Sequence, residues 1–221
     1  KKSLIFFCFL LTGISMCQSK WVLDTLANVD KISEHEIDFL SEAPIIDGIL
    51  DKNLNSLPIR NFGFARRKIT DKVIPINYRI AYGSEFLYFF IEAEGERLTY
   101  RDRAYQNGDG FVLLIAKPQP NNGATDEFYE LACSAVNKPS QERFRHIFWN
   151  YNVNKLFVPT SSNTKLEFSE ANGKISFELK LPWDDIRPFH PWISPGIGFN
   201  LSFCKAVEPD SRIWYTLVSE D

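Results

Sequence analysis

Residues 76–93 read INYRIAYGSEFLYFFIEA and contain the two clearest strand patterns of the chain. Over residues 76–82, apolar side chains alternate with polar or small ones, which is typical of a strand with one buried and one solvated face. Residues 86–93 are almost continuously apolar, which predicts a central strand covered on both faces. The segment Gly83-Ser84-Glu85 lies between the two runs. This stretch therefore predicts a β protein.

The rest of the chain repeats these patterns. Further strands are predicted at residues 111–116, 127–135, 143–149, 174–181, 197–203 and 212–218. The turn residues Asn137, Lys138 and Pro139 make a hairpin of the runs on either side. Residues 183–186 have room for at most one helical turn before Pro188. Many short strands with Gly and Pro between them predict an all-β fold, an antiparallel two-sheet β-sandwich of jelly-roll type.

The N-terminus has the order of regions found in a secretory signal. Lys1 and Lys2 precede an apolar run over residues 4–11, which is too short to remain as a membrane-spanning helix. We expect a signal peptide over residues 1–19, a spacer over 20–41 and the sandwich over 42–221. Residues 14–17 (ISMC) resemble a lipoprotein cleavage box that would place a lipid on Cys17, although Met16 departs from the small residue expected there. Both a lipid-anchored and a simply cleaved form stay open, and both predict an exported protein, periplasmic, cell-surface or secreted.

Charge and cysteine content limit the partners. The chain has 25 basic and 28 acidic residues, and setting aside the three lysines of residues 1–20 leaves a net charge of −6. A nucleic-acid partner is not expected without a basic run. After signal cleavage Cys133 and Cys204 remain. Strand parity places Cys133 with Leu131 but Cys204 on the side opposite Phe203, so we expect two separate thiols.

No catalytic or transition-metal motif stands out. The three histidines lack a Gly-x-Ser-x-Gly nucleophile motif, and no carboxylate pair is spaced as in sandwich glycosidases. His and Cys residues are too scattered to predict a zinc site. Asp47 and Asp51 are candidate calcium ligands, because calcium prefers oxygen ligands. The alternative is a turn in which Asp47 accepts hydrogen bonds from nearby backbone N–H groups.

Four segments together resemble the family 9 carbohydrate-binding modules within the DOMON-like β-sandwich superfamily. The first, residues 43–51 (APIIDGILD), resembles the family's opening "P-x-I-D-G-x-x-D" signature. The others, in order, are residues 78–82 (YRIAY) with Leu87-Tyr88, residues 108–114 (GDGFVLL), and residues 177–183 (FELKLPW) with Gly198-Phe199-Asn200. The resemblance covers about residues 42 to 207 and implies a non-catalytic module that binds an oligo- or polysaccharide, often with structural calcium.

The resemblance also implies where sugar would bind. Family members use facing aromatic rings with charged and amide groups; here Leu54 replaces an expected aromatic residue and Val112 replaces an expected Glu. Matching motif positions and rings in polar loops give six candidates, namely Arg79, Tyr105, Asp109, Trp149, Asn150 and Tyr151. The alternative for Trp149 is that it caps the core. We expect the other late tryptophans, Trp183, Trp192 and Trp214, to be packing rings.

Rival functions follow from the same residues. The replacements at Leu54 and Val112 would fit a structural or adaptor sandwich that has lost its sugar site. Haem binding, known in related sandwiches, is not expected through a Met/His pair, because the single Met is Met16 in the signal. We expect further protein after Asp221, where any catalytic domain would lie.

Overall fold

The alternating run at Ile76 forms β4 (Ile76–Tyr82), and the apolar run after it forms β5 (Phe86–Glu94). In the computed structural model these two strands are the centre of one sheet. β4 pairs with β5, β5 pairs with β11 (Lys174–Pro182), and β11 pairs with β10 (Lys165–Ala171). All three pairings are antiparallel. On the other side, β1 (Asp38–Phe39) runs parallel to β4, and β2 (Arg60–Asn61) also pairs with β4.

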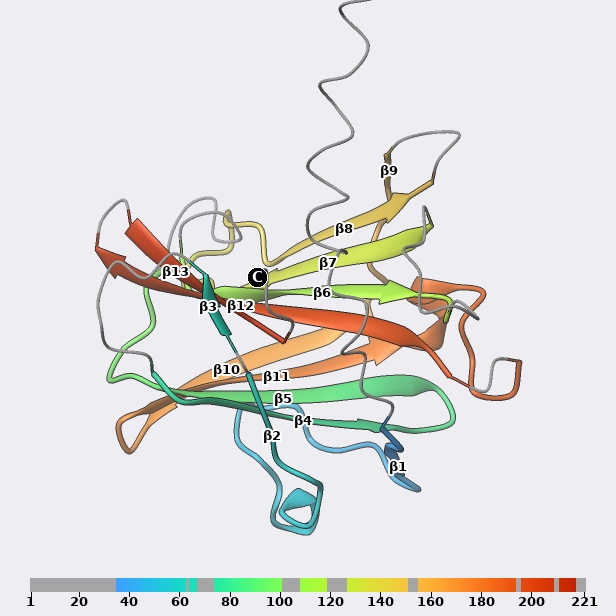
Figure 1. Cartoon of the computed structure of the whole chain (residues 1–221), viewed down its shortest axis with the longest axis horizontal. Coiled ribbons are helices and arrows are strands. Elements are labelled where there is room, and N and C mark those ends of the chain that lie inside the picture. The colour runs from blue at the N-terminus through green and yellow to red at the C-terminus, as the bar shows by residue number, and fades with distance from the viewer. Residues whose placement is uncertain are drawn as a thin grey trace, which may run out of the picture.

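The second sheet contains the remaining strands in the order β3-β13-β12-β6-β7-β8-β9. Its strands are β3 (Phe64–Arg66), β6 (Gly110–Ala116), β7 (Phe128–Ser134), β8 (Phe144–Trp149), β9 (Leu156–Phe157), β12 (Gly198–Glu208) and β13 (Ser211–Thr216). All neighbours in this sheet are antiparallel, and the hairpin predicted after residue 135 is β7–β8. Figure 1 shows the two sheets as two layers, so the predicted all-β sandwich is confirmed.

The structure describes residues 35–62, 64–66, 74–100, 108–118, 127–150, 155–193, 196–208 and 211–217. The predicted signal peptide, Cys17, Tyr105 and Tyr151 lie outside these residues. β1 falls at the end of the predicted spacer and already pairs with the sandwich. Within the described residues no helix is long and apolar enough to cross a membrane.

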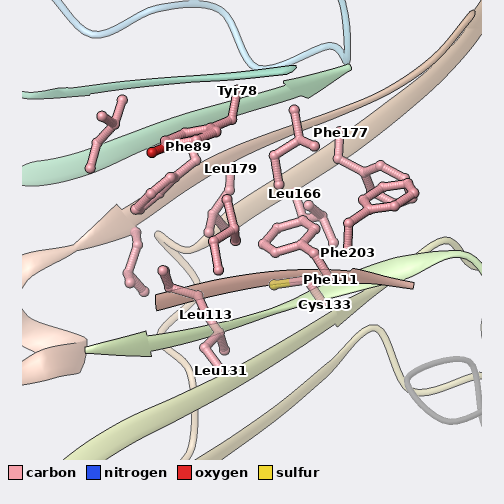
Figure 2. Close-up of a cluster of buried hydrophobic side chains, with 14 of the residues drawn as sticks. Tyr78, Phe89, Phe111, Leu113, Leu131, Cys133, Leu166, Phe177, Leu179 and Phe203 are labelled. Atoms are coloured by element: carbon pink, nitrogen blue, oxygen red, sulfur yellow. The ribbon is translucent and has the colours of Figure 1, made fainter. Parts of the chain in front are cut away.

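The core lies between the sheets, where the inward side chains of both layers meet (Figure 2). Rings interlock there edge to face; Phe177 of the first sheet lies 5.8 Å from Phe111 and 5.9 Å from Phe203 of the second. Cys133 belongs to this core, whereas Cys204 is buried on the other side of its sheet. Neither cysteine is in a disulfide, so the two separate thiols predicted from strand parity are confirmed.

A second apolar cluster covers the outer face of the first sheet. Residues 40–57 run beneath β4 and β5 in Figure 1 and place Leu54 of the short helix η2 (Lys52–Leu54) against Tyr88 and Phe90. β5 is therefore buried on both faces, which confirms the reading of its continuous apolar run. Leu54, which stands where the family has an aromatic ring, is a buried packing residue.

A buried carboxylate fixes the opening signature to this outer face. Glu178 is fully buried and accepts hydrogen bonds from the backbone N–H groups of Asp47 (3.0 Å) and Gly48 (2.9 Å) and from the Tyr88 hydroxyl (2.8 Å). Ser176 completes the contact by donating to the Gly48 carbonyl at 2.6 Å. Gly48 has φ +83°, and a Cβ there would lie 2.6 Å from the Phe168 carbonyl carbon, so only glycine fits.

Two local features differ from the sequence predictions. Strand β10 was not predicted, although it is followed by Asn172-Gly173, whose positive φ values of 55° and 73° belong to a tight hairpin turn into β11. Trp183 is buried as predicted, in the short helix η3 (Trp183–Ile186), and donates to the Gly83 carbonyl. Trp192, predicted to pack, is instead 87% exposed in the loop that follows η3.

Candidate functional site

Trp149 ends β8 on the outer face of the second sheet. Its strand neighbours Phe144 and Phe148 pack against the core, so alternation turns Arg145, Ile147 and Trp149 outward. Trp149 therefore does not cap the core, which removes the alternative considered from the sequence. Its ring is half-buried, and Ile147, the next outward residue along β8, is buried.

Glu130 connects this tryptophan to a cation. It lies on β7 directly opposite Ile147, so its side chain reaches both diagonal neighbours on β8. One carboxylate oxygen accepts from the Arg145 guanidinium at 2.7 Å, and the other accepts from the Trp149 indole N–H at 3.0 Å. The Glu130 side chain is only 16% exposed. These two bonds fix the plane of the indole and hold a guanidinium beside it.

Further side chains surround the Trp149 ring. The ring of Phe128 stacks on it, with centroids 6.0 Å apart and planes 20° apart. Lys155 Nζ lies 5.7 Å from the Trp149 centroid and 4.7 Å from that of Phe157. Such an exposed cation–π contact contributes about 0.5–1 kcal/mol. The ammonium can therefore leave the ring at small cost.

Asn150 follows with an amide at the same strand end. Its Nδ2 donates to Glu127 Oε1 at 2.5 Å across the hairpin. The structure thus brings the predicted pair Trp149 and Asn150 together with three charged residues that sequence reasoning did not select for binding, Glu130, Arg145 and Lys155. We call these five residues the Trp149 site. A ring with fixed donors and acceptors around it can stack on and hydrogen-bond a polyhydroxylated ring.

Arg79 lies far from this site, on the other sheet. It stands between the core residues Tyr78 and Ile80 of β4, so its side chain is turned to the outer face that residues 40–57 cover. Its Nε is buried and has no hydrogen-bond partner among the described residues. Arg79 and Trp149 therefore belong to opposite faces of the sandwich and do not form one site.

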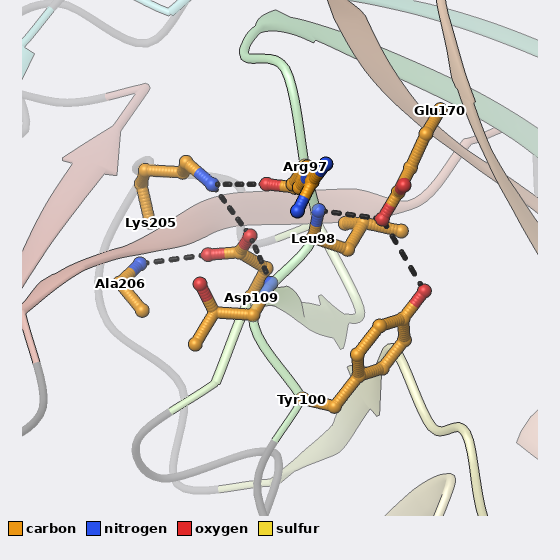
Figure 3. A network of polar contacts seen from close by, with 8 residues as sticks. Arg97, Leu98, Tyr100, Asp109, Glu170, Lys205 and Ala206 are labelled. Atoms are coloured by element: carbon orange, nitrogen blue, oxygen red, sulfur yellow. Dashed lines mark hydrogen bonds and ion pairs between the residues drawn. The ribbon is translucent and has the colours of Figure 1, made fainter.

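Asp109 is fully buried in a network of its own (Figure 3). Its carboxylate accepts from Lys205 Nζ at 2.6 Å, from the Ala206 N–H at 2.7 Å and from the Thr99 N–H at 2.9 Å. Burial raises the pKa of Asp109, and the neighbouring ammonium of Lys205 opposes that rise. This carboxylate joins the end of β12 to the segment before β6, so its surroundings are those of a structural group.

Asp47 and Asp51 lie in the opening turn. Asp47 Oδ1 accepts from the Ile49 N–H at 2.9 Å, and Asp51 Oδ2 accepts from the Ile45 N–H at 3.3 Å. Asp47 thus has the turn contact that was the alternative to calcium binding. In the described ranges no group of three or more His, Cys, Asp or Glu residues is placed to hold a metal ion.

The residues around Trp149 that sequence reasoning did not select can be recognised only once the pairing of β7 with β8 is known. Phe128 and Glu130 differ by two positions and Arg145 and Trp149 by four, so the members of each pair share a face of their strand. Only the register of the hairpin, with Phe128 opposite Trp149, shows that the two sets meet. Sequence alternation alone gives the face of each strand but not its partner.

Solved structures with this arrangement of strands are known. A family 9 carbohydrate-binding module from Caldicellulosiruptor kristjanssonii, solved in complex with glucose, superposes with a TM-score of 0.53 and 13% identity over 84% of this chain and 87% of that one. The chain shares the fold of the family 9 modules. The same module in complex with cellotriose gives the same TM-score and identity, over 84% and 85% of the two chains. A proposed carbohydrate-binding protein from Bacteroides uniformis gives a TM-score of 0.55 and 12% identity over 82% and 88%. Comparison with protein-family models and with curated proteins gives no match.

Proposed function

We propose that this domain is a non-catalytic carbohydrate-binding module whose ligand is an oligo- or polysaccharide bound at the Trp149 site. The observation that carries the proposal is the Glu130 carboxylate, which holds the Arg145 guanidinium and the Trp149 indole on one face. A pyranose ring offers C–H groups for the indole and hydroxyls for the charged and amide groups. The complexes of the C. kristjanssonii module with glucose and cellotriose support this ligand class.

The test is calorimetric titration of the domain with gluco-, xylo- and manno-oligosaccharides of one to four units. Replacing a central aromatic contact typically costs at least about 2 kcal/mol, or roughly thirtyfold in affinity. We expect that loss from Trp149→Ala. Trp192→Ala is the matched control, because Trp192 is also a tryptophan but is 87% exposed in another loop, and it should leave affinity unchanged. Silence of the folded wild-type domain across the whole panel would refute the proposal.

A structural or adaptor role is the second candidate. The observation in its favour is that Lys155 Nζ already lies over the Trp149 ring, with Phe128 stacked on the same indole. If the domain has lost sugar binding, Lys155→Met should expose no affinity for any saccharide. If sugar displaces the ammonium, the same variant should retain or gain stacking affinity, so the two roles separate.

We also propose that the domain is exported. The proposal rests on the charged and apolar order of residues 1–19 and on Cys17. Mass spectrometry of the mature protein from its native host would show either an acylated Cys17 at the N-terminus or a cleaved, unmodified one. Retention of residues 1–16 would refute export through this signal.

A further inference from the structure

β9 places a second exposed ring beside Trp149. Phe157 lies opposite Ile147 in the register of β8 with β9, and opposite residues of an antiparallel pair share a face. Because Ile147 and Trp149 both point outward, Phe157 is a diagonal neighbour of Trp149 on the outer face. Phe157 is 64% exposed, and Figure 1 shows β9 at the edge of the second sheet. The two rings therefore form one apolar surface that is accessible from the β9 side.

The Lys155 side chain covers this surface. Its Nζ lies 4.7 Å from the ring centroid of Phe157 and 5.7 Å from that of Trp149. Continuing the register of β8 with β9 by two residues places Lys155 opposite Trp149, whereas Phe128 is opposite Trp149 on the β7 side. The indole thus has the Phe128 ring on one side and the ammonium on the other. A sugar that stacks on both the indole and Phe157 has to move the ammonium.

The other charged groups around the indole already have partners. Glu130 uses one carboxylate oxygen for Arg145 and the other for the indole N–H. Glu127 accepts from the Asn150 amide. Lys155, in contrast, is exposed and makes no ion pair with a carboxylate in the part of the chain that the structure describes. Its ammonium is therefore the charge of this surface that a ligand can take as a partner.

A displaced ammonium distinguishes acidic from neutral saccharides. With a neutral sugar, C–H contacts replace the cation–π contact, and the ammonium returns to water. In a uronic acid unit the carboxylate projects from the edge of the pyranose ring, so the ring can stack while the carboxylate accepts from the ammonium on its flexible stem. Charge-assisted hydrogen bonds are roughly twice as strong as neutral ones. An amino sugar would instead bring a second cation to rings that already hold one.

We propose that this surface selects saccharides that carry carboxylates, as in uronic acid units, and that Lys155 is the residue that selects them. This inference rests on the proposed function of the Trp149 site and names its ligand class. It assigns Phe157 as a second stacking ring. The chain as a whole has more acidic than basic residues, 28 against 25, so its general charge does not attract an anion. The preference has to come from the local contact with Lys155.

The test compares neutral oligosaccharides with their uronic acid counterparts by calorimetric titration of the domain, with linkage and length held fixed. Tetramers of β-1,4-linked glucose and mannose are each paired with the tetramer of the corresponding uronic acid. An exposed ion pair contributes up to about 1 kcal/mol, which is about fivefold in affinity. We therefore expect wild-type affinity about fivefold higher for the acidic member of a pair at about 0.01 M salt. At about 1 M salt, where charges are screened, the difference should fall below about twofold.

Three substitutions separate the charge of Lys155 from the stacking surface. Lys155→Met keeps an apolar stem and removes the charge, so the ratio of acidic to neutral affinity should fall to about one while neutral affinity stays equal or rises. Lys155→Arg should keep the preference. Phe157→Ala should weaken both members of a pair by the same factor. Lys138→Met is the matched control, because Lys138 is an exposed lysine at the other end of the β7–β8 hairpin and should leave the ratio unchanged.

The possible failures of the two proposals are distinct. Equal affinity for the two members of each pair, or a preference that survives Lys155→Met, would overturn the selection of acidic saccharides and leave the proposed function standing. Tighter binding of the glucosamine tetramer than of the glucose tetramer would also overturn it. Absence of binding to neutral and acidic saccharides alike would overturn both proposals.

Discussion

Glu178 is the residue whose replacement should most clearly test how the opening signature is attached. Its fully buried carboxylate accepts from two backbone N–H groups of the turn and from the Tyr88 hydroxyl. Glu178→Leu keeps the volume similar and removes every acceptor. Glu178→Gln keeps an acceptor oxygen for the two N–H groups and leaves an amide N–H₂ that can donate to the Tyr88 oxygen.

The expected magnitudes follow from these three bonds. A buried donor left without an acceptor costs about 1–3 kcal/mol, and three such donors together, partly relieved by water, cost about 3–5 kcal/mol. That is a large part of a domain stability of about 5–15 kcal/mol. Glu178→Gln keeps hydrogen bonds to all three groups and loses only the extra strength that a charged acceptor gives them. We therefore expect a loss of stability of about 1 kcal/mol.

Urea denaturation followed by tryptophan fluorescence measures these differences, and hydrogen exchange at the Asp47 and Gly48 amides shows whether the turn itself opens. Glu94→Leu is the control, because Glu94 is an exposed carboxylate at the end of β5 and should change stability by no more than about 0.5 kcal/mol. If Glu178→Leu cost less than about 1 kcal/mol, or Glu178→Gln cost as much as Leu, the argument from unsatisfied donors would be wrong.

The pH dependence of the stability gives a second test of Glu178. Burial raises the pKa of Glu178 above its ordinary 4.5, while the hydrogen bonds from Tyr88 and the turn oppose the rise. The folded protein therefore holds this proton more tightly than the unfolded chain does, and stability from Glu178 falls as the pH rises from below 4.5 through the folded pKa. Glu178→Gln does not titrate. The stability difference, wild type minus Gln, should decrease over this window and stay constant above it; an increase would contradict the raised pKa.

Two further predictions concern the stability of the fold, at Gly48 in the opening turn and at the buried Lys205–Asp109 ion pair. Gly48→Ala should cost about 2–4 kcal/mol, since its φ of +83° is disfavoured for alanine and its Cβ meets the Phe168 backbone. Gly173→Ala, at φ +73° with nothing within 4 Å of a Cβ, should cost only about 1 kcal/mol, and equal losses in urea denaturation would exclude the clash. Lys205→Met should destabilise by about 3–5 kcal/mol at pH 7, because it leaves the Asp109 carboxylate buried without its cation. Lower pH should reduce this loss by protonating Asp109, and adding Asp109→Asn should restore part of the stability at pH 7; a loss independent of pH would argue against a buried charge.

The strands could be predicted well because alternation is local. The runs at 76–82 and 174–181 alternate with a period of two and the run at 86–93 is continuously apolar, and all three became strands with the expected faces. The short strands β1, β2, β3 and β9 were not predicted, and neither was the longer β10, which has a less regular apolar pattern and whose clearest signal was the Asn172-Gly173 turn. Turn chemistry would have identified it where hydrophobic period did not.

The candidate site was only partly accessible to the same reasoning. Trp149 and Asn150 were selected because a strand ends there in a polar loop, which is a local signal. Glu130 and Arg145 were not selected, because their contact with Trp149 depends on the register of two strands. Arg79 was selected from a motif that orders segments along the chain but does not assign them to a sheet.

The sequence by itself determined the all-β class, the faces of most strands and the separation of the two thiols, because all of these follow from side-chain parity. Only the tertiary structure decided that Arg79 and Trp149 lie on opposite faces and that Asp109 is buried with Lys205. Pairing and layering join residues distant in sequence, and the balance of many packing contacts sets them rather than any local pattern.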